Sequence, residues 1–203
     1  MSLNHTTRTA LIVLAAGLAL SALLITTGCG DSADDAETSQ GAKAGLAIAQ
    51  SALETMAPDA KLLVVETAEG VTPTSTPVWA YLFGSPEDDK TYVVYVSDGQ
   101  AMNASEYGTA GLSEEEWSQV PGTDDWKIDN DEAYEKALEI SGAEGDPAAY
   151  YMGFQTYVPE AFAATSTVSA FTWYVSFDPG ESGASTDTVA VDATTGEAEK
   201  AAE

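Results

Sequence analysis

The sequence is short of the side chains that most enzymes use for chemistry. Among its 203 residues there is one cysteine, Cys29, one histidine, His5, and one arginine, Arg8. Ser–His and Cys–His nucleophilic pairs need a base that titrates near neutral pH, and the same nitrogen and sulfur ligands are preferred by zinc and most transition metals. The composition therefore leaves little material for either kind of site.

The N-terminal segment has the layout of a secretory signal. Arg8 precedes a long apolar run that ends at Ile25, and small residues then lead to Cys29 in a TTGC segment. This segment resembles the bacterial lipobox, in which a lipid is attached to the cysteine and cleavage occurs just before it; Thr26 stands where that pattern usually has leucine. We predict that residues 1–28 are a lipoprotein signal peptide and that Cys29 is lipidated. An uncleaved membrane anchor is the alternative, because about 17 to 25 apolar residues span a bilayer.

Cleavage and acylation at this position would remove both reactive side chains from the mature chain. His5 would leave with the signal, and Cys29 would be available neither for a disulfide nor as a thiol. We therefore predict that the protein is not an enzyme and has no catalytic residue, no cofactor and no metal ligand. A hydrolase that uses carboxylates alone is the remaining enzyme hypothesis. With 33 acidic residues, some pairing is guaranteed and carries no information.

The mature chain is strongly acidic. All 33 acidic residues follow Cys29, against six lysines, which gives a formal charge of −27. This charge repels nucleic acid, and we predict no nucleic-acid partner. The acid excess is either a solvated surface, suited to a saline habitat, or a set of weak divalent-cation sites. The clusters at 87–89, 114–116 and 124–125 lack the alternating spacing of a calcium loop, which favours solvated surface.

Residues 29–41 form a polar segment that we predict to be a flexible tether. After this tether, the sequence predicts one helix followed by three strands. The helix is predicted over Ala42–Ala57, where Leu46, Ala49, Leu53 and Met56 recur at helical spacing before Pro58. The predicted strands cover residues 61–67, 78–83 and 91–96.

The same order recurs in the second half. A helix is predicted over Asn130–Ser141, with Asp129 as its N-cap, Glu132 completing a capping box and Gly142 ending it. The predicted strands cover residues 149–157, 171–177 and 188–192. Trp79 precedes Val96 by 17 residues, and Trp173 precedes Val191 by 18. We therefore predict an α+β fold of two repeated helix plus antiparallel three-stranded sheet units, at 42–104 and 128–203, joined by a connector at 105–127.

Three segments resemble PepSY-type domains: residues 126–138, Trp173-Tyr-Val175 and the closing Val191-Asp-Ala-Thr-Thr-Gly-Glu197. The second unit matches best, and the first is degenerate because Ser97-Asp98-Gly99-Gln100 replaces the family's Asp-x-x-Thr-Gly. The resemblance implies a small unit of one helix on an antiparallel sheet. It also implies a secreted or membrane protein that inhibits a peptidase or binds an envelope partner, and it brings no catalytic residue.

The predicted function is that of a non-enzymatic, lipid-anchored protein on the extracytoplasmic face of the cell membrane. It would bind or regulate another envelope or secreted protein, with a peptidase as one candidate and the membrane contacted through the lipid. The alternative is an acidic lipoprotein that binds cations or a solute, with weak divalent cations as its ligands.

Several aromatic and turn residues have two interpretations. Trp79, Tyr81, Phe83, Trp173 and Phe177 lie at strand spacing, which favours a core over a ligand groove. The segment 192–196 favours a hairpin turn over a binding loop. Connector residues 112–117 are predicted to form a short helix. Trp117 and Trp126 either seal the interface between the two units or form an exposed patch for a partner.

Overall fold

The computed structural model describes residues 41–68, 77–142, 147–153, 171–177 and 188–200. The predicted signal, Cys29 and nearly all of the tether lie outside these residues. The helices are α1 (Ala42–Leu53), α2 (Glu114–Gln119), the short 3-10 helix η1 (Thr123–Asp125) and α3 (Asn130–Ser141). The strands are β1 (Lys61–Thr67), β2 (Trp79–Ser85), β3 (Lys90–Ser97), β4 (Gln100–Thr109), β5 (Pro147–Gly153), β6 (Thr172–Phe177), β7 (Thr188–Asp192) and β8 (Ala198–Lys200).

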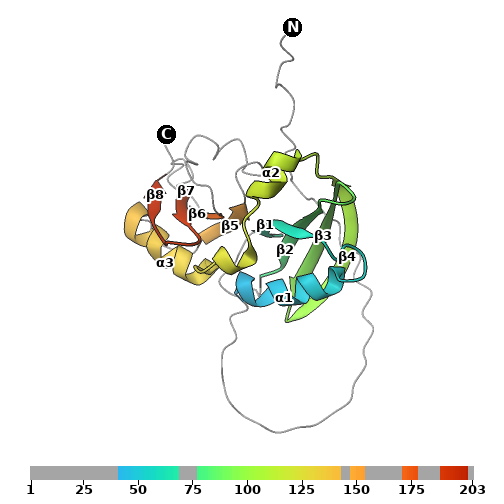
Figure 1. Cartoon of the computed structure of the whole chain (residues 1–203). Coiled ribbons are helices and arrows are strands. Elements are labelled where there is room, and N and C mark those ends of the chain that lie inside the picture. The colour runs from blue at the N-terminus through green and yellow to red at the C-terminus, as the bar shows by residue number, and fades with distance from the viewer. Residues whose placement is uncertain (1–40, 69–76, 143–146, 154–170, 178–187, 201–203) are drawn as a thin grey trace, which may run out of the picture. The chain divides into compact units, whose positions relative to one another are not determined.

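All eight of these strands belong to one antiparallel sheet, in the order β4-β3-β2-β1-β5-β6-β7-β8. β1 and β5 lie side by side at its centre, with Val65 opposite Met152, and so join the strands that follow α1 to those that follow α3 (Figure 1). The predicted α+β class is confirmed. The sheet differs from the predicted one, because each half contributes four strands to a single sheet. That the halves are copies of one unit stays a prediction.

The two strands that the sequence analysis missed lie at the sheet edges. β4 is exposed or half-buried along its whole length, so it lacks the apolar alternation that marks a core strand. Asp98 and Gly99 have φ values of 48° and 69°, the left-handed pair of a tight hairpin turn, and they return the chain from β3 into β4. β8 has three residues. β4 therefore runs past the predicted unit boundary at residue 104.

The helix ends follow local chemistry. α3 has the predicted bounds, with Gly142 in the left-handed conformation just after it. The Asp129 carboxylate caps α3 by accepting from Asn130 N at 2.9 Å. The Glu132 carboxylate lies 3.9 Å from Lys136 Nζ instead of completing the predicted capping box. α1 ends at Leu53, four residues before the predicted end, and Met56 is exposed.

The two long helices cover the same face of the sheet, which we call the helical face. α1 packs against β2, β3 and β4, and α3 packs against β6, β7 and β8 (Figure 1). The Tyr81 hydroxyl donates to Ala42 O at the start of α1, and the Trp173 indole donates to Ile128 O just before α3. The rings of Trp79 and Trp173 lie 6.3 Å apart, so the two halves share one aromatic core on this face.

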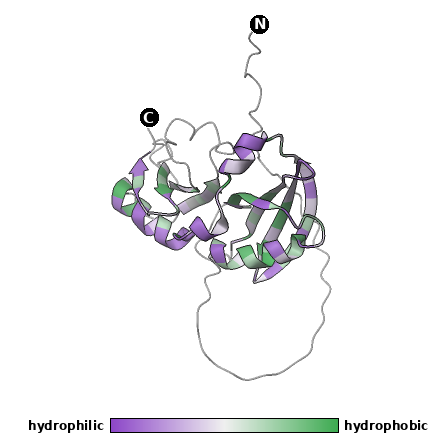
Figure 2. Cartoon of the chain, in the orientation of Figure 1, coloured by the Kyte–Doolittle hydropathy of each residue, from purple (hydrophilic) through white to green (hydrophobic). Residues whose placement is uncertain are grey.

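The strand aromatics form this core. Strands β2 and β3 are largely hydrophobic and α2 is largely hydrophilic (Figure 2). Each of the five aromatic residues assigned to the core is at most 3 % exposed, which confirms the core interpretation over the groove: Trp79, Tyr81, Phe83, Trp173 and Phe177.

The starts of the two helices meet through side chains. The Asp129 carboxylate accepts from Lys43 N at 3.0 Å, and Asn130 Oδ1 accepts from Ala42 N at 2.9 Å. Residues at the start of α3 therefore satisfy backbone N–H groups that open α1. Burial raises the pKa of Asp129 above its usual range, although hydrogen bonds from Asn130 N and Lys43 N oppose that shift.

The two connector tryptophans pack on different parts of the sheet. Trp126 is fully buried, lies 5.8 Å from the Trp173 ring and donates from its indole to Ile128 O. Trp117 belongs to α2, which is the predicted short helix with a capping box between Ser113 and Glu116. A methyl group built on Gly84 would lie 2.5 Å from Trp117, so Trp117 packs against the C-terminal end of β2. Because both side chains are buried, the exposed-patch interpretation is wrong.

Gly84 offers a direct test of this packing. An added Cβ would lie 2.5 Å from Trp117 Cη2 and 2.7 Å from Leu63 Cδ1, and both side chains are buried. We expect Gly84→Ala to lower the free energy of unfolding by about 1–3 kcal/mol, the usual effect of overpacking a core. Gly108→Ala is the matched control, because its Cβ would meet only Thr91 Oγ1, at 3.7 Å. Equal urea midpoints for the two variants would contradict the packing of Trp117 on β2.

Candidate functional site

One row of side chains crosses the sheet on the face opposite the long helices. Glu66 of β1 pairs with Ala80 of β2 on one side and with Tyr151 of β5 on the other. Ala80 in turn pairs with Tyr95 of β3, and Tyr151 pairs with Tyr174 of β6. Directly paired residues in antiparallel strands point to the same face. We call Glu66, Tyr95, Tyr151 and Tyr174 the Glu66 row.

The alternation of the strands assigns the row to its face. Trp79 and Tyr81 flank Ala80 and belong to the helical face, so Ala80 and its paired neighbours point the other way. Glu66 and Tyr95 are separated by one strand, which places their backbones about 10 Å apart. Ala80 lies between them, so the long side chains of Glu66 and Tyr95 stand on either side of its methyl group.

Burial shifts the protonation equilibrium of the Glu66 carboxyl group toward its neutral form. Removal from water raises the pKa of its carboxyl group to about 7, because the charged form loses solvation. No hydrogen bond or ion pair joins this carboxylate to another described residue. The side chain is half-buried, so it remains accessible from solvent. Glu66 is therefore divided between its neutral and charged forms near neutral pH.

Tyr95 is electrostatically connected to Glu66. Burial raises the pKa of the Tyr95 hydroxyl, and the nearby Glu66 and Tyr107 groups add to that rise. The Tyr95 hydroxyl oxygen is buried and has no hydrogen-bond partner. The β4 residue that pairs with Tyr95 is the exposed Asn103, and Tyr107 lies four residues further along β4 and is 46 % exposed. The rings of Tyr151 and Tyr174 lie 6.3 Å apart and continue the row on the other side.

The Glu66 row combines one carboxylate with tyrosine hydroxyl groups and ring faces. A carboxylate, a hydroxyl and several ring faces can hold a group rich in hydrogen-bond donors. Carboxylate-only glycoside hydrolysis needs a second carboxylate about 5 to 9.5 Å from the first. The described residues paired with Glu66 are Ala80 and Tyr151, so no second acid faces it across either strand.

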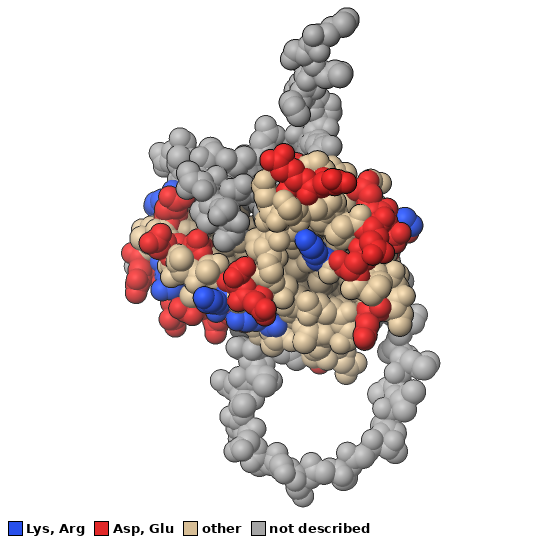
Figure 3. Space-filling view, viewed as in Figure 1, with Lys and Arg blue, Asp and Glu red and all other residues tan. Residues whose placement is uncertain are grey.

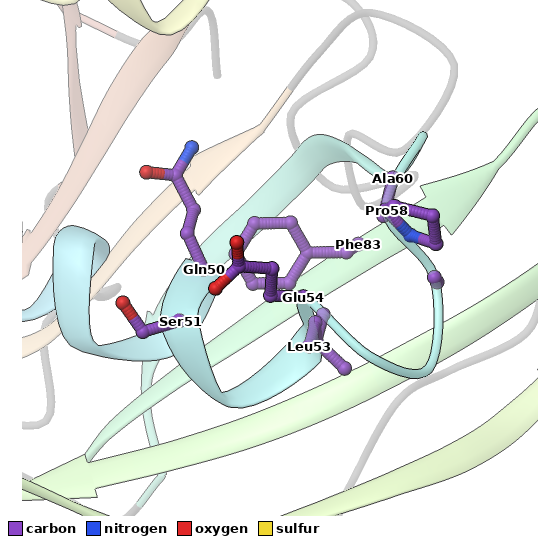
Figure 4. A pocket seen from close by; sticks show the side chains of 8 residues that line it. Gln50, Ser51, Leu53, Glu54, Pro58, Ala60 and Phe83 are labelled. Carbon is purple, nitrogen blue, oxygen red and sulfur yellow. The ribbon is translucent and has the colours of Figure 1, made fainter.

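A hollow lies at the end of α1. It has a volume of about 360 Å³, and Leu53, Ala57 and Phe83 supply its apolar lining (Figure 4). Gln50, Ser51 and Glu54 of the helix add polar side chains to the lining. Glu54 is the one ionisable side chain in the lining of the hollow.

Asp59 and Asp89 are acidic side chains that hold local backbone structure. Acidic side chains gather over α2 and around the β3–β4 side of the sheet, with scattered lysines (Figure 3). The Asp59 carboxylate accepts from Ser85 Oγ at 2.8 Å and from Glu87 N at 3.0 Å; burial alone would raise its pKa, but these bonds lower it overall. Asp89 accepts from Gly111 N at 2.8 Å. Within the described ranges, no three acidic, histidine or cysteine side chains are grouped to hold a metal ion.

The segment 192–196 forms a turn, as predicted. Asp192 Oδ1 accepts from Thr194 N at 2.7 Å and from Thr195 N at 2.9 Å, and Gly196 has a φ of 75°. The turn is also joined to the connector, because Ala193 O accepts from both Lys127 N and Ile128 N. The segment therefore holds the start of α3 against β7.

The predicted lipidation residue, Cys29, lies outside the described residues. Among the helices that are described, none is long and apolar enough to cross a membrane. The sequence analysis assigned no catalytic, cofactor or metal residue, and it missed the Glu66 row. The available signal was Glu66, an acid that directly follows the apolar run LLVV in β1.

Comparison with known proteins gives the fold. No protein-family profile matches the chain, and no curated protein matches it by sequence. A crystal structure of a protein from Clostridium difficile 630, provisionally described as a lipoprotein, is similar with a TM-score of 0.50. The two chains are 11% identical, and the match covers 74% of this chain and 88% of the other. At this identity, the likeness establishes a shared α+β fold.

Proposed function

We propose that this chain is a non-enzymatic, lipid-anchored extracytoplasmic protein that binds another envelope or secreted protein. The observation that carries the proposal is the Glu66 row on the sheet face opposite the long helices, in which Glu66, Tyr95 and Tyr151 are half-buried and Tyr174 is buried. Tyrosines are favoured in protein interfaces because each combines a large apolar ring with a hydrogen-bonding group.

The anchor supplies the compartment in this proposal. The TTGC segment at Cys29 follows an apolar run, and an acidic chain of this kind would be held at the membrane by the lipid rather than by charge. The lipoprotein description of the Clostridium difficile 630 structure agrees with this assignment.

The proposal includes two PepSY-like units. The two halves contain corresponding cross-strand pairs, which support this part of the proposal. In the first half Trp79 of β2 pairs with Val96 of β3, and in the second half Trp173 of β6 pairs with Val191 of β7. Each half also places its helix before its first strand. A peptidase is the partner class that the family resemblance suggests, and regulation of a peptidase is the finer form of this proposal.

Affinity capture from solubilised envelopes tests the binding function. The tagged chain should recover one specific protein, and Tyr107→Ala should lose it while Ile140→Ala keeps it. The two side chains are matched, because each is 46 % exposed, but Ile140 lies on α3. Equal recovery by both variants, or no specific protein with the parent chain, would contradict the proposal.

The rival function is cation or solute binding, favoured by the charge of −27. Calorimetric titration with calcium and magnesium separates the two functions. Saturable heat at micromolar concentration would support the rival, and its absence would remove it.

Lipidation at Cys29 gives a separate prediction. Cells fed a palmitate analogue should label the parent chain, and Cys29→Ser should abolish the label because no other cysteine is present. The Cys29→Ser variant should also leave the membrane fraction. Undiminished labelling of the serine variant would overturn the anchor assignment.

A further inference from the structure

Strand β4 forms one edge of the sheet. It pairs with β3 along one side, and among the described residues no strand lies on its other side. Every residue of its sequence, QAMNASEYGT, is exposed or half-buried. The outer side of such a strand presents backbone N–H and C=O groups that can pair with a further strand. The lysines and prolines that protect many edge strands from pairing do not occur in β4.

Two bulges shape this edge. Tyr107 is an extra residue in β4, because its neighbours Glu106 and Gly108 pair with consecutive residues of β3. Met102 is the extra residue of a second bulge nearer the start of the strand. Both side chains are large and hydrophobic, and Met102 is 50 % exposed and Tyr107 46 %. The regular ladder between the bulges covers residues 103–106, which suits a short added strand rather than continued growth of the sheet.

The charge along the edge is uneven. Acidic side chains gather around the β3–β4 side of the sheet (Figure 3). Asp98 is exposed in the turn before β4, and the three acids at 87–89 are exposed in the turn beside its last residue, which pairs with Lys90. Within the strand, the Glu106 carboxylate lies 2.8 Å from Lys90 Nζ. The centre of the edge is therefore nearly uncharged and its ends are negative.

This charge pattern determines which strand fits. A second copy that paired antiparallel through β4 would bring Asp98 of one chain beside the acids at 87–89 of the other, and like charges opposed in this way are unfavourable. A segment with basic residues at both ends meets the opposite charge at both places.

We propose that β4 accepts an extended segment of the partner protein as an added strand. The segment pairs with residues 103–106, places apolar side chains against Met102 and Tyr107, and carries basic residues beyond them. This inference rests on the proposed function, because the segment belongs to the protein that the chain binds. It adds the neighbouring edge of the sheet to the contact through the Glu66 row.

The test titrates the chain into a fluorescently labelled peptide, Lys-Lys-Thr-Val-Thr-Val-Thr-Val-Lys-Lys amide, and follows anisotropy. We expect saturable binding, because the lysines meet the acids at the ends of β4 and the central residues favour a strand. The same peptide N-methylated at its six central residues keeps the charge and the side chains but lacks the central N–H donors. It should bind at least about tenfold more weakly. A peptide with glutamate in place of every lysine should not bind.

Variants of the chain locate the bound peptide. Met102→Ala should weaken binding several-fold, and Ile140→Ala, which removes a comparably exposed side chain from α3, should leave it unchanged. Both variants should fold, because exposed substitutions change stability little. Amide hydrogen exchange gives a second measurement, in which the bound peptide should slow the exchange of outward-pointing N–H groups within residues 103–106.

Equal binding of the N-methylated peptide would show general attraction of a cation to an acidic protein and would overturn the inference. Equal binding by the Met102→Ala and Ile140→Ala variants, or no binding of the lysine-ended peptide, would overturn it as well. A dimer of the chain alone that Met102→Ala disrupts, seen by analytical ultracentrifugation, would show that a second copy occupies the edge instead.

The inference and the proposed function fail in different ways. A specific protein captured from envelopes together with a silent peptide titration would refute strand addition and leave the proposed function standing. Peptide binding without any captured protein would contradict the proposed function and leave β4 as a strand-binding edge.

Discussion

Replacement of Trp173 by alanine is expected to lower the free energy of unfolding by about 3–5 kcal/mol. Trp173 is fully buried, and its ring lies 5.8 Å from Trp126 and 6.3 Å from Trp79. It therefore links the connector, the first half and the second half of the sheet. Its indole N–H donates to Ile128 O at 2.8 Å, a bond that alanine cannot replace.

Chemical denaturation monitored by circular dichroism measures this effect. Trp173→Phe should keep most of the ring packing and lose the hydrogen bond, so its loss should be smaller than that of alanine. Tyr107→Ala removes another large ring, but one that is 46 % exposed, and should change stability little. A Trp173→Ala protein within about 1 kcal/mol of the parent would contradict the shared aromatic core.

The stability of the parent protein is expected to fall as the pH rises from about 5 to 8. Glu66 has an ordinary pKa of 4.5 and a folded-state pKa of about 7, so the folded chain binds more protons than the unfolded chain between these values. Stability decreases with pH wherever the folded state holds the extra proton. The full difference corresponds to at most about 3 kcal/mol. Because Glu66 is partly exposed, solvent screening makes the realised change smaller.

Glu66→Gln isolates this titration, because glutamine stays neutral across the range. The only histidine, His5, precedes the described residues and falls within the predicted signal, so histidine does not obscure the transition in a chain that begins after Cys29. Asp129 also has a raised pKa, but it is common to both proteins and cancels in their difference. Glu66→Gln should gain stability relative to the parent at pH 8 and match it near pH 5. A constant difference between the two denaturation curves at both pH values would refute the burial of Glu66.

Local sequence features predicted the individual elements well. α3 begins and ends as expected because Asp129 caps it and Gly142 stops it, and β6 was visible in its alternating aromatics. β4 was missed because an edge strand has no buried face to create alternation. The shorter α1 shows that periodicity alone does not mark a helix end, since Met56 fits the spacing and still lies outside the core.

The candidate site could not be predicted from the sequence, because it depends on pairing between distant strands. Val65 and Met152 face each other across β1 and β5, and no local signal sets that register. Only this pairing places Tyr151 beside Glu66. That the chain is a binding protein without catalytic side chains stays a prediction.

Site-specific photo-crosslinking in intact cells tests the central claim, binding of an extracytoplasmic protein at the Glu66 row, most directly. A photoreactive amino acid at position 107 should give one discrete adduct, and the same residue at the equally exposed position 140 should give none. The adduct at position 107 should weaken when Glu66→Gln is added and should persist with Glu139→Gln. An adduct from position 140 alone, or one at position 107 that is indifferent to Glu66→Gln, would contradict this account.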